Sequence, residues 1–128
     1  MLRSPDPKVP GANLRFQGLL EKRGGGWVMS KVRRAPFPSG GHPELLATRE
    51  GPILYLSAQG VWYTDDAGGS WRRLPGEPPT TYYPRSVQAA DGTIYVLSHQ
   101  GGDYWYGEGD EAIVLHKFRL MQQVPVSR

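Results

Sequence analysis

Short runs of mainly apolar residues lie along the chain, and turns rich in Gly, Pro and Asp separate these runs. Short apolar runs that are bounded by turn residues and rich in β-branched and aromatic residues are typical of β-strands. The clearest runs are residues 52–57, 61–64 and 93–98. The pattern therefore predicts an all-β protein built from short antiparallel strands.

The first unit predicted from the pattern covers residues 13–34. Two extended runs, 13–21 and 26–33, flank Lys22-Arg23-Gly24-Gly25, which is suited to a hairpin turn. Residues 1–12 are rich in Pro and are expected to be irregular. Residues 35–41 hold two Pro and three Gly or Ser residues, so we interpret them as a connector.

Two further units repeat this scheme. Residues 42–76 predict a complete four-stranded unit, with strands at 44–48, 52–57, 61–64 and 70–74. Residues 82–120 predict a third unit, with strands at 83–89, 93–98 and 111–120 and a long loop at 100–110. A fourth strand is missing from this unit, because the tail at 121–128 is short and contains a Pro.

One turn carries the most specific motif of the chain, and its five signature residues are Thr64, Asp66, Gly68, Ser70 and Trp71. The Asp carboxylate can accept hydrogen bonds from N–H groups of its own turn, and a glycine at 68 or 69 can adopt positive φ. The two hydroxyl residues can join the strand ends. The Trp ring can pack on the core while its indole N–H seeks an acceptor.

This pattern resembles the Asp-box, the turn repeated in β-propellers of sialidases and other bacterial neuraminidase repeat proteins. The resemblance implies a partial β-propeller over residues 13–120. Blades of this kind take roughly 40–50 residues and closed propellers have 4–8 blades, so 128 residues supply about two and a half blades. In the family the Asp-box lies away from the substrate, so Asp66 is interpreted as structural.

The resemblance also implies candidate catalytic and substrate-binding residues. In sialidases a tyrosine attacks the sugar, a glutamate takes its proton, and arginines bind the substrate carboxylate. Tyr83 has the family's spacing to the Asp91-Gly92 turn and is the candidate nucleophile; an aromatic residue packed at a strand end is the alternative. The candidate substrate-binding residues are Arg49, Arg85 and His99, although His99 stands where the family often has glutamate.

The loop at 101–111 combines three aromatic residues with four carboxylates. Aromatic rings stack on sugars and carboxylates bind hydroxyl groups, so Tyr104 and Trp105 are candidate sugar contacts. A calcium loop and an ordinary connecting loop are the alternatives, although the spacing of an EF-hand is absent. His42 and His99 can line the same mouth, and none of the histidines has zinc-ligand spacing.

Composition narrows the possible partners. The net charge of +3 is small and the basic residues are dispersed, which argues against nucleic-acid binding. No signal peptide or membrane-spanning run is recognisable, and the chain has no Cys, so the compartment stays open. We expect no metal or cofactor. A glycan ligand is expected, together with missing propeller blades or self-association.

Three functions are compatible with these patterns. The parent protein can be a glycoside hydrolase of the exo-sialidase type that acts on terminal sugars of glycans. It can instead be a non-catalytic propeller that binds carbohydrate or protein. The chain can also be a truncated product that is inactive alone, because the aspartate and first arginine of the family belong to early blades.

Overall fold

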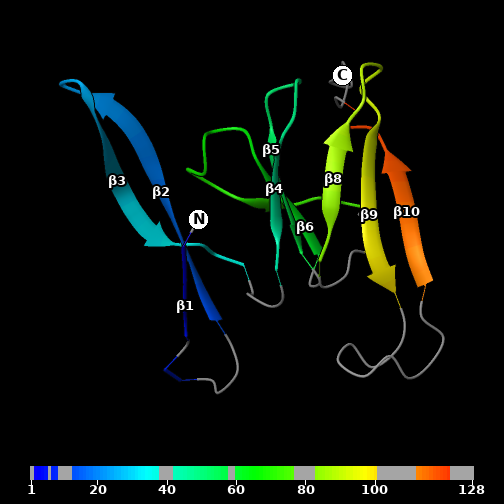
Figure 1. Cartoon of the computed structure of the whole chain (residues 1–128), viewed down its shortest axis with the longest axis horizontal. Helices are drawn as coiled ribbons and strands as arrows, with labels where there is room; N and C mark the ends of the chain where they lie inside the picture. The colour runs from blue at the N-terminus through cyan, green and yellow to red at the C-terminus, as the bar shows by residue number, and fades with distance from the viewer. Residues whose placement is uncertain are drawn as a thin grey trace, which may run out of the picture.

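The computed structural model describes residues 2–5, 7–8, 13–37, 42–57, 60–76, 83–100 and 112–121. These residues form ten β-strands in three antiparallel sheets, and they contain no helix. Figure 1 shows the N-terminal, central and C-terminal sheets following one another in chain order along the longest axis. The prediction of an all-β protein is therefore confirmed.

The N-terminal sheet has the strand order β1-β2-β3. Its strands are β1 (Leu2–Pro5), β2 (Asn13–Arg23) and β3 (Gly26–Arg34). The predicted hairpin is confirmed, with Gly24 and Gly25 at positive φ in its turn. The expectation that residues 1–12 are irregular is wrong for β1, which pairs with the start of β2. As an edge strand that ends at Pro5, β1 tolerates a residue without an N–H group.

The central sheet has the predicted four strands in the order β4-β5-β6-β7. They are β4 (Glu44–Ala47), β5 (Ile53–Ser57), β6 (Gly60–Thr64) and β7 (Arg72–Arg73). The C-terminal sheet has three strands in the order β10-β9-β8. They are β8 (Arg85–Gln88), β9 (Ile94–Gln100) and β10 (Ala112–Phe118). The loop expected at 100–110 lies outside the described residues from position 101 onward.

Residues 43–57 and 84–98 form a structural repeat with an offset of 41 residues, which matches Gly51 with Gly92 and Ser57 with Ser98. The turn between β4 and β5 is closed by bonds from Thr48 N to Pro52 O (3.0 Å) and from Gly51 N to Thr48 O (3.2 Å). The turn between β8 and β9 has the same two bonds at the equivalent positions, with lengths of 2.8 and 3.0 Å. The central and C-terminal sheets are therefore built on one repeated plan.

The central sheet buries both of its faces. On one face Leu54 and Leu56 of β5 pack with Ile94 and Val96 of β9, and all four side chains are fully buried. On the other face Tyr55 stacks on Phe37 of the connector after β3, with ring centroids 3.9 Å apart. Successive strand residues point to opposite faces, so β5 contacts the sheet on either side.

The first strands of the central and C-terminal sheets lie side by side. Near their starts, the Ser86 hydroxyl donates a hydrogen bond of 2.8 Å to Glu44. Near their ends, the Arg49 backbone N–H donates one of 2.8 Å to the Gln88 side chain. Because both bonds follow the chain in the same order, β4 and β8 run in the same direction.

We predict that Phe37→Ala lowers the free energy of unfolding by about 3–5 kcal/mol, as expected for a buried aromatic residue. Phe37 is 6% exposed and contacts Tyr55, Trp62 and Trp71, so its removal leaves a cavity against the central sheet. Denaturant titration measures the change. Met121→Ala, at a position that is 88% exposed, is the control and is expected to stay within about 0.5 kcal/mol. Equal effects of the two substitutions would contradict this core.

Candidate functional site

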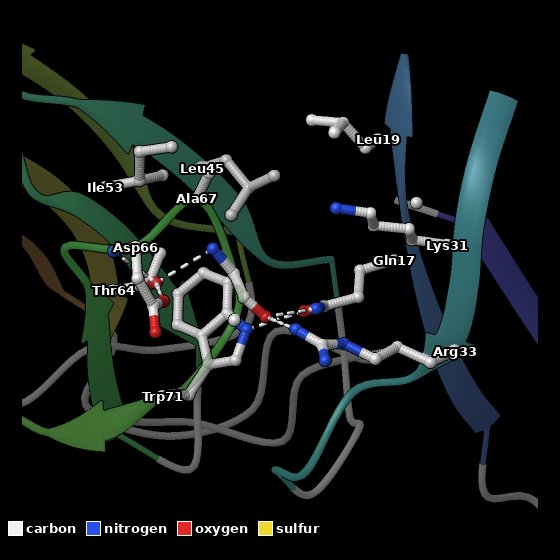
Figure 2. Close-up of a pocket in the computed structure, with 13 residues that line it drawn as sticks. Gln17, Leu19, Lys31, Arg33, Leu45, Ile53, Thr64, Asp66, Ala67 and Trp71 are labelled. Carbon is white, nitrogen blue, oxygen red and sulfur yellow. Dashed lines mark hydrogen bonds between the residues drawn. The ribbon is translucent and has the colours of Figure 1, made fainter. Parts of the chain in front are cut away.

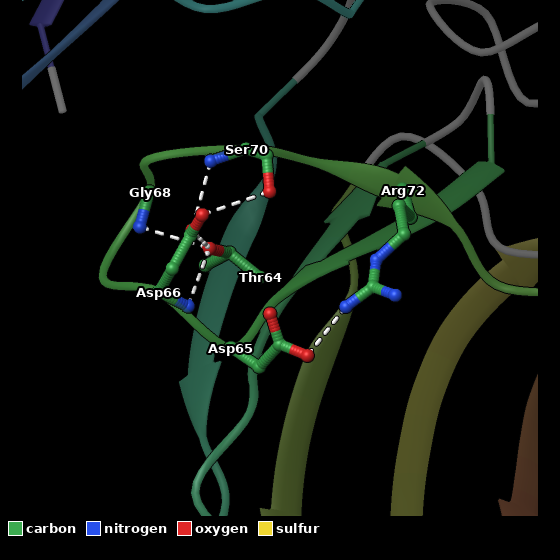
Figure 3. A network of polar contacts seen from close by, with 6 residues as sticks. All are labelled: Thr64, Asp65, Asp66, Gly68, Ser70 and Arg72. Atoms are coloured by element: carbon green, nitrogen blue, oxygen red, sulfur yellow. Dashed lines mark hydrogen bonds and ion pairs between the residues drawn. The ribbon is translucent and has the colours of Figure 1, made fainter.

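The turn at residues 64–71 is a closed network of hydrogen bonds centred on Asp66 (Figure 3), and it is called the Asp-box turn here for its resemblance to that motif. Oδ1 of Asp66 accepts bonds from the Thr64 hydroxyl (2.7 Å) and the Ser70 N–H (2.8 Å). Oδ2 accepts the Ser70 hydroxyl at 2.8 Å. The Thr64 oxygen in turn accepts the Gly68 N–H at 2.8 Å. These bonds join the end of β6 to the segment that leads into β7.

The backbone of this turn explains the glycines. Ala67 and Gly68 have φ of 55° and 83°, so the positive φ expected at 68 or 69 falls on 67 and 68. Gly69 is required for a different reason. A Cβ atom there would lie 2.6 Å from Oδ2 of Asp66. The missing side chain at 69 therefore gives the carboxylate room to bond Ser70.

Asp66 behaves as a structural carboxylate. Hydrogen bonds from the Ser70 N–H, the Thr64 hydroxyl and the Ser70 hydroxyl lower its pKa to about 2. Both oxygens are occupied by these donors, which favour the ionised form. A general acid must instead hold a proton near neutral pH. Asp66 is therefore unsuited to acid catalysis, as expected for the structural residue of an Asp-box.

The turn also attaches the N-terminal sheet to the central sheet (Figure 2). The indole N–H of Trp71 donates to Oε1 of Gln17 on β2, and Nε2 of Gln17 donates to the carbonyl of Gly68, both at 2.5 Å. Arg33 of β3 donates to the same carbonyl. The Trp71 ring packs edge-on against Phe37, with centroids 5.2 Å apart. One residue of the motif thus contacts both sheets.

A cavity of about 330 Å³ lies between the Asp-box and the N-terminal sheet (Figure 2). Lys31 and Arg33 line one side, and Leu45, Ile53 and the Asp-box residues line the other. The carboxylate of Asp66 and the Gly68 carbonyl already bond to protein groups. The cavity is therefore interpreted as the space between two packed sheets, and the candidate site lies elsewhere.

A second group of polar side chains gathers at the opposite end of the sheets, where β4 and β8 begin. The ring of His42, just before β4, stacks on the ring of Tyr83, just before β8, with centroids 4.6 Å apart and planes 18° apart. Tyr83 is 40% exposed, so one part of its ring faces solvent. The predicted residues Tyr83 and Arg85 are thus brought together with His42.

Beside this stacked pair lies a pocket of about 370 Å³. It is lined by residues of all three sheets or the segments before them: Arg15, His42, Pro43, Glu44, Leu45, Tyr55 and Arg85. Two guanidinium groups line the pocket with a single carboxylate among these residues. Planar guanidinium groups bind carboxylates and phosphates through paired hydrogen bonds. The pocket is therefore suited to an anion.

Two residues of the pocket lining, Arg15 and Tyr55, are buried, and their burial affects the charge state of the Tyr55 phenol. Arg15 is only 9% exposed, and the ring of Tyr55 is fully buried beside it. Burial raises the pKa of the Tyr55 phenol, and the positive charge of Arg15 partly opposes this rise. Tyr55 is therefore a neutral phenol at neutral pH, and Arg15 supplies fixed positive charge at the bottom of the pocket.

The remaining predicted site residues lie apart from this pocket or outside the residues that the structure describes. Arg49 is at the other end of β4 and donates to the carbonyl of Ala89. His99 belongs to β9, where its backbone pairs with Ile113. Tyr104 and Trp105 lie outside the described residues. The structure thus groups Tyr83 with Arg85 and does not bring Arg49 to them.

Two charged residues of the pocket lining, Glu44 and Arg15, were not predicted from the sequence, whereas His42 was expected to line the mouth. A ring, a Pro and a charged residue stand at the start of β4 as His42-Pro43-Glu44, and the same order stands at the start of β8 as Tyr83-Pro84-Arg85. Comparing the two repeats would have placed Glu44 at the mouth beside His42. Arg15 has no such signal, because only sheet packing brings it there.

Within the described residues, no group of three or more His, Cys, Asp or Glu side chains could hold a metal ion. The same part of the chain contains no helix that is long and apolar enough to cross a membrane. Comparison with models of protein families found none that matches, and comparisons with curated proteins and solved structures found no match either. The resemblance to sialidases therefore rests on the chain's own motif and repeat.

We predict that Gly69→Ala destabilises the fold, because the new methyl group must displace the Asp66 carboxylate from its bonds. Overpacking of this kind costs about 1–3 kcal/mol. Gly26→Ala is the matched control, since a Cβ atom at 26 meets only the Arg23 carbonyl, at 3.9 Å. Thermal melting of both variants measures the difference. A Gly69→Ala protein as stable as Gly26→Ala would contradict the geometry of the turn.

The lowered pKa of Asp66 predicts a specific pH dependence of stability. In the unfolded chain its carboxyl titrates near 3.8, and in the folded chain near 2. A lowered folded pKa means that the stabilisation is fully present above the unfolded value and is lost as pH falls from 3.8 towards 2. The melting temperature of Asp66→Asn is expected to lie below that of the wild type at pH 6. The gap should narrow below pH 4, whereas a gap that is constant with pH would contradict the ionised network.

Proposed function

We propose that the chain is a three-blade segment of a sialidase-like β-propeller and that it binds an acidic sugar without cleaving it. The observation that carries the proposal is the pocket where β4 and β8 begin. Arg15, Arg85 and His42 line this pocket, and the ring of Tyr83 stacks on that of His42. Guanidinium groups suit a sugar carboxylate, and an exposed aromatic ring suits a sugar face.

Two features support the propeller arrangement. The repeat of 41 residues lies within the period of propeller blades. The first strands of consecutive sheets, β4 and β8, also lie side by side and run in the same direction, as strands around a central axis must. The pocket lies where these strands begin, and the Asp-box lies at the other end, as in the family that the motif resembles.

Binding is favoured over hydrolysis by the groups that line the pocket. A sialidase needs a nucleophile, its base and a separate acid, held in a fixed geometry. Glu44 is the only carboxylate among the residues that line this pocket, and the candidate nucleophile Tyr83 stacks on His42 without being one of those residues. The Glu44 carboxylate also accepts the hydroxyl of Ser86. The residues that line this pocket therefore offer no separate group for the acid.

We predict that the protein binds sialic acid and that Arg85→Ala weakens binding at least tenfold, because one side of the carboxylate clamp is lost. Titration calorimetry with sialic acid and with neutral galactose measures affinity and selectivity. Arg72→Ala is the control, since Arg72 is exposed on β7 and pairs with Asp65 near the Asp-box. Equal binding by wild type and Arg85→Ala would overturn the proposed site.

The same preparation is expected to release no leaving group from a fluorogenic sialoside. Release that Tyr83→Phe abolishes would replace the binding proposal with hydrolysis and would make Tyr83 the nucleophile. Release that Tyr83→Phe leaves unchanged would point to a contaminating enzyme, and the binding measurement would still decide the proposal.

A further inference from the structure

The outer faces of both terminal sheets carry large apolar side chains that no part of the described chain covers. On the C-terminal sheet, cross-strand pairing places Val87, Leu97, Ile113 and Leu115 on one face, and they are 45–77% exposed. On the N-terminal sheet, Leu20, Trp27, Met29 and Val32 are 48–67% exposed. We call these two surfaces the C-face and the N-face.

The 41-residue repeat shows that the C-face corresponds to a face that is buried elsewhere in the same chain. Leu97 of the C-face is the counterpart of Leu56, and Val87 is the counterpart of Leu46. Leu56 is fully buried and Leu46 packs against the same cluster, because the C-terminal sheet covers them. Leu97 and Val87 are 45% and 60% exposed, since no described sheet follows. The C-face is therefore shaped to receive another sheet.

We propose that two copies of this chain close into one ring of six sheets, with the C-face of each copy against the N-face of the other. The number of copies follows from closure. Propellers close with 4–8 blades, so one copy with three sheets is too few and three copies are too many. Two such contacts related by a two-fold axis leave neither apolar face exposed, whereas an arrangement that fails to close would form filaments.

This inference rests on the propeller arrangement proposed above and is independent of the acidic-sugar site. Its test is the mass of the full chain by light scattering and sedimentation at tens of micromolar. The expected mass is twice 14.2 kDa. A monomer at this concentration, or a mass that keeps growing beyond two copies, would overturn the proposal.

Charged substitutions distinguish the proposed contact from other dimers. A C-face variant carries Ile113→Lys and Leu115→Lys, and an N-face variant carries Trp27→Lys and Met29→Lys. Either variant spoils both contacts of its own dimer, so each is expected to be monomeric with the circular dichroism of a folded β protein. Met121→Lys, which changes an exposed apolar residue beyond β10, is the control and should remain dimeric.

Mixing the two variants gives the decisive result. A mixed pair retains one contact in which both faces are unaltered, so a population of dimers should reappear. If either face variant stays dimeric, the copies associate through like faces or through the edge of β10, and the proposed contact is wrong. If both variants unfold, the uncharged single substitutions Leu115→Ser and Met29→Ser are expected to give folded chains that associate more weakly. Association as strong as that of the wild type in these variants would overturn the proposal.

Discussion

The requirement to cover both faces of the central sheet organises this protein. Leu54 and Leu56 point to one side of β5 and Tyr55 points to the other, so neither side can face water without a large loss of apolar burial. The C-terminal sheet satisfies one side, and the connector residue Phe37 with the N-terminal sheet satisfies the other. Alternate residues of β5 point to opposite faces of the central sheet, so this single strand contacts a different part of the chain on each side.

The Asp-box turn orients a side chain that joins the central sheet to the rest of the structure. Its hydrogen bonds hold the end of β6 and the segment before β7 in one geometry, which places Trp71 against Phe37 and within reach of Gln17. A turn that looks local is therefore also a contact between sheets. Its ionised carboxylate is most stable where it accepts several donors, which explains why the motif combines two hydroxyl residues with an Asp and small residues between them.

The sequence predicted the strands that are specified by their own residues. It did not predict the features that depend on residues far away in the chain. Short apolar runs and turn chemistry predicted β5, β6 and β9, because the residues of each run favour a strand by themselves. Strand β1 was missed, since a Pro-rich segment becomes a strand only when β2 offers an edge. In the candidate site, the family's spacing pointed to Tyr83, and Arg85 follows it two residues later. Arg15 could not be found, because its place beside Tyr55 depends on how separate sheets pack.

The repeat shows that the same residue type can be buried in one sheet and exposed in the next. Leu56 and Leu97 occupy equivalent positions of one repeat, yet the first is fully buried and the second is 45% exposed. The same residue type at equivalent positions therefore has a burial that depends on the neighbouring sheet. The same logic applies to the pocket, because each repeat places a ring, a Pro and a charged residue at the start of its first strand, as His42 and Tyr83 show. If further sheets lie around a common axis, as the proposed propeller requires, each would bring its own set of polar groups to that end, and the number of sheets would then set the charge there.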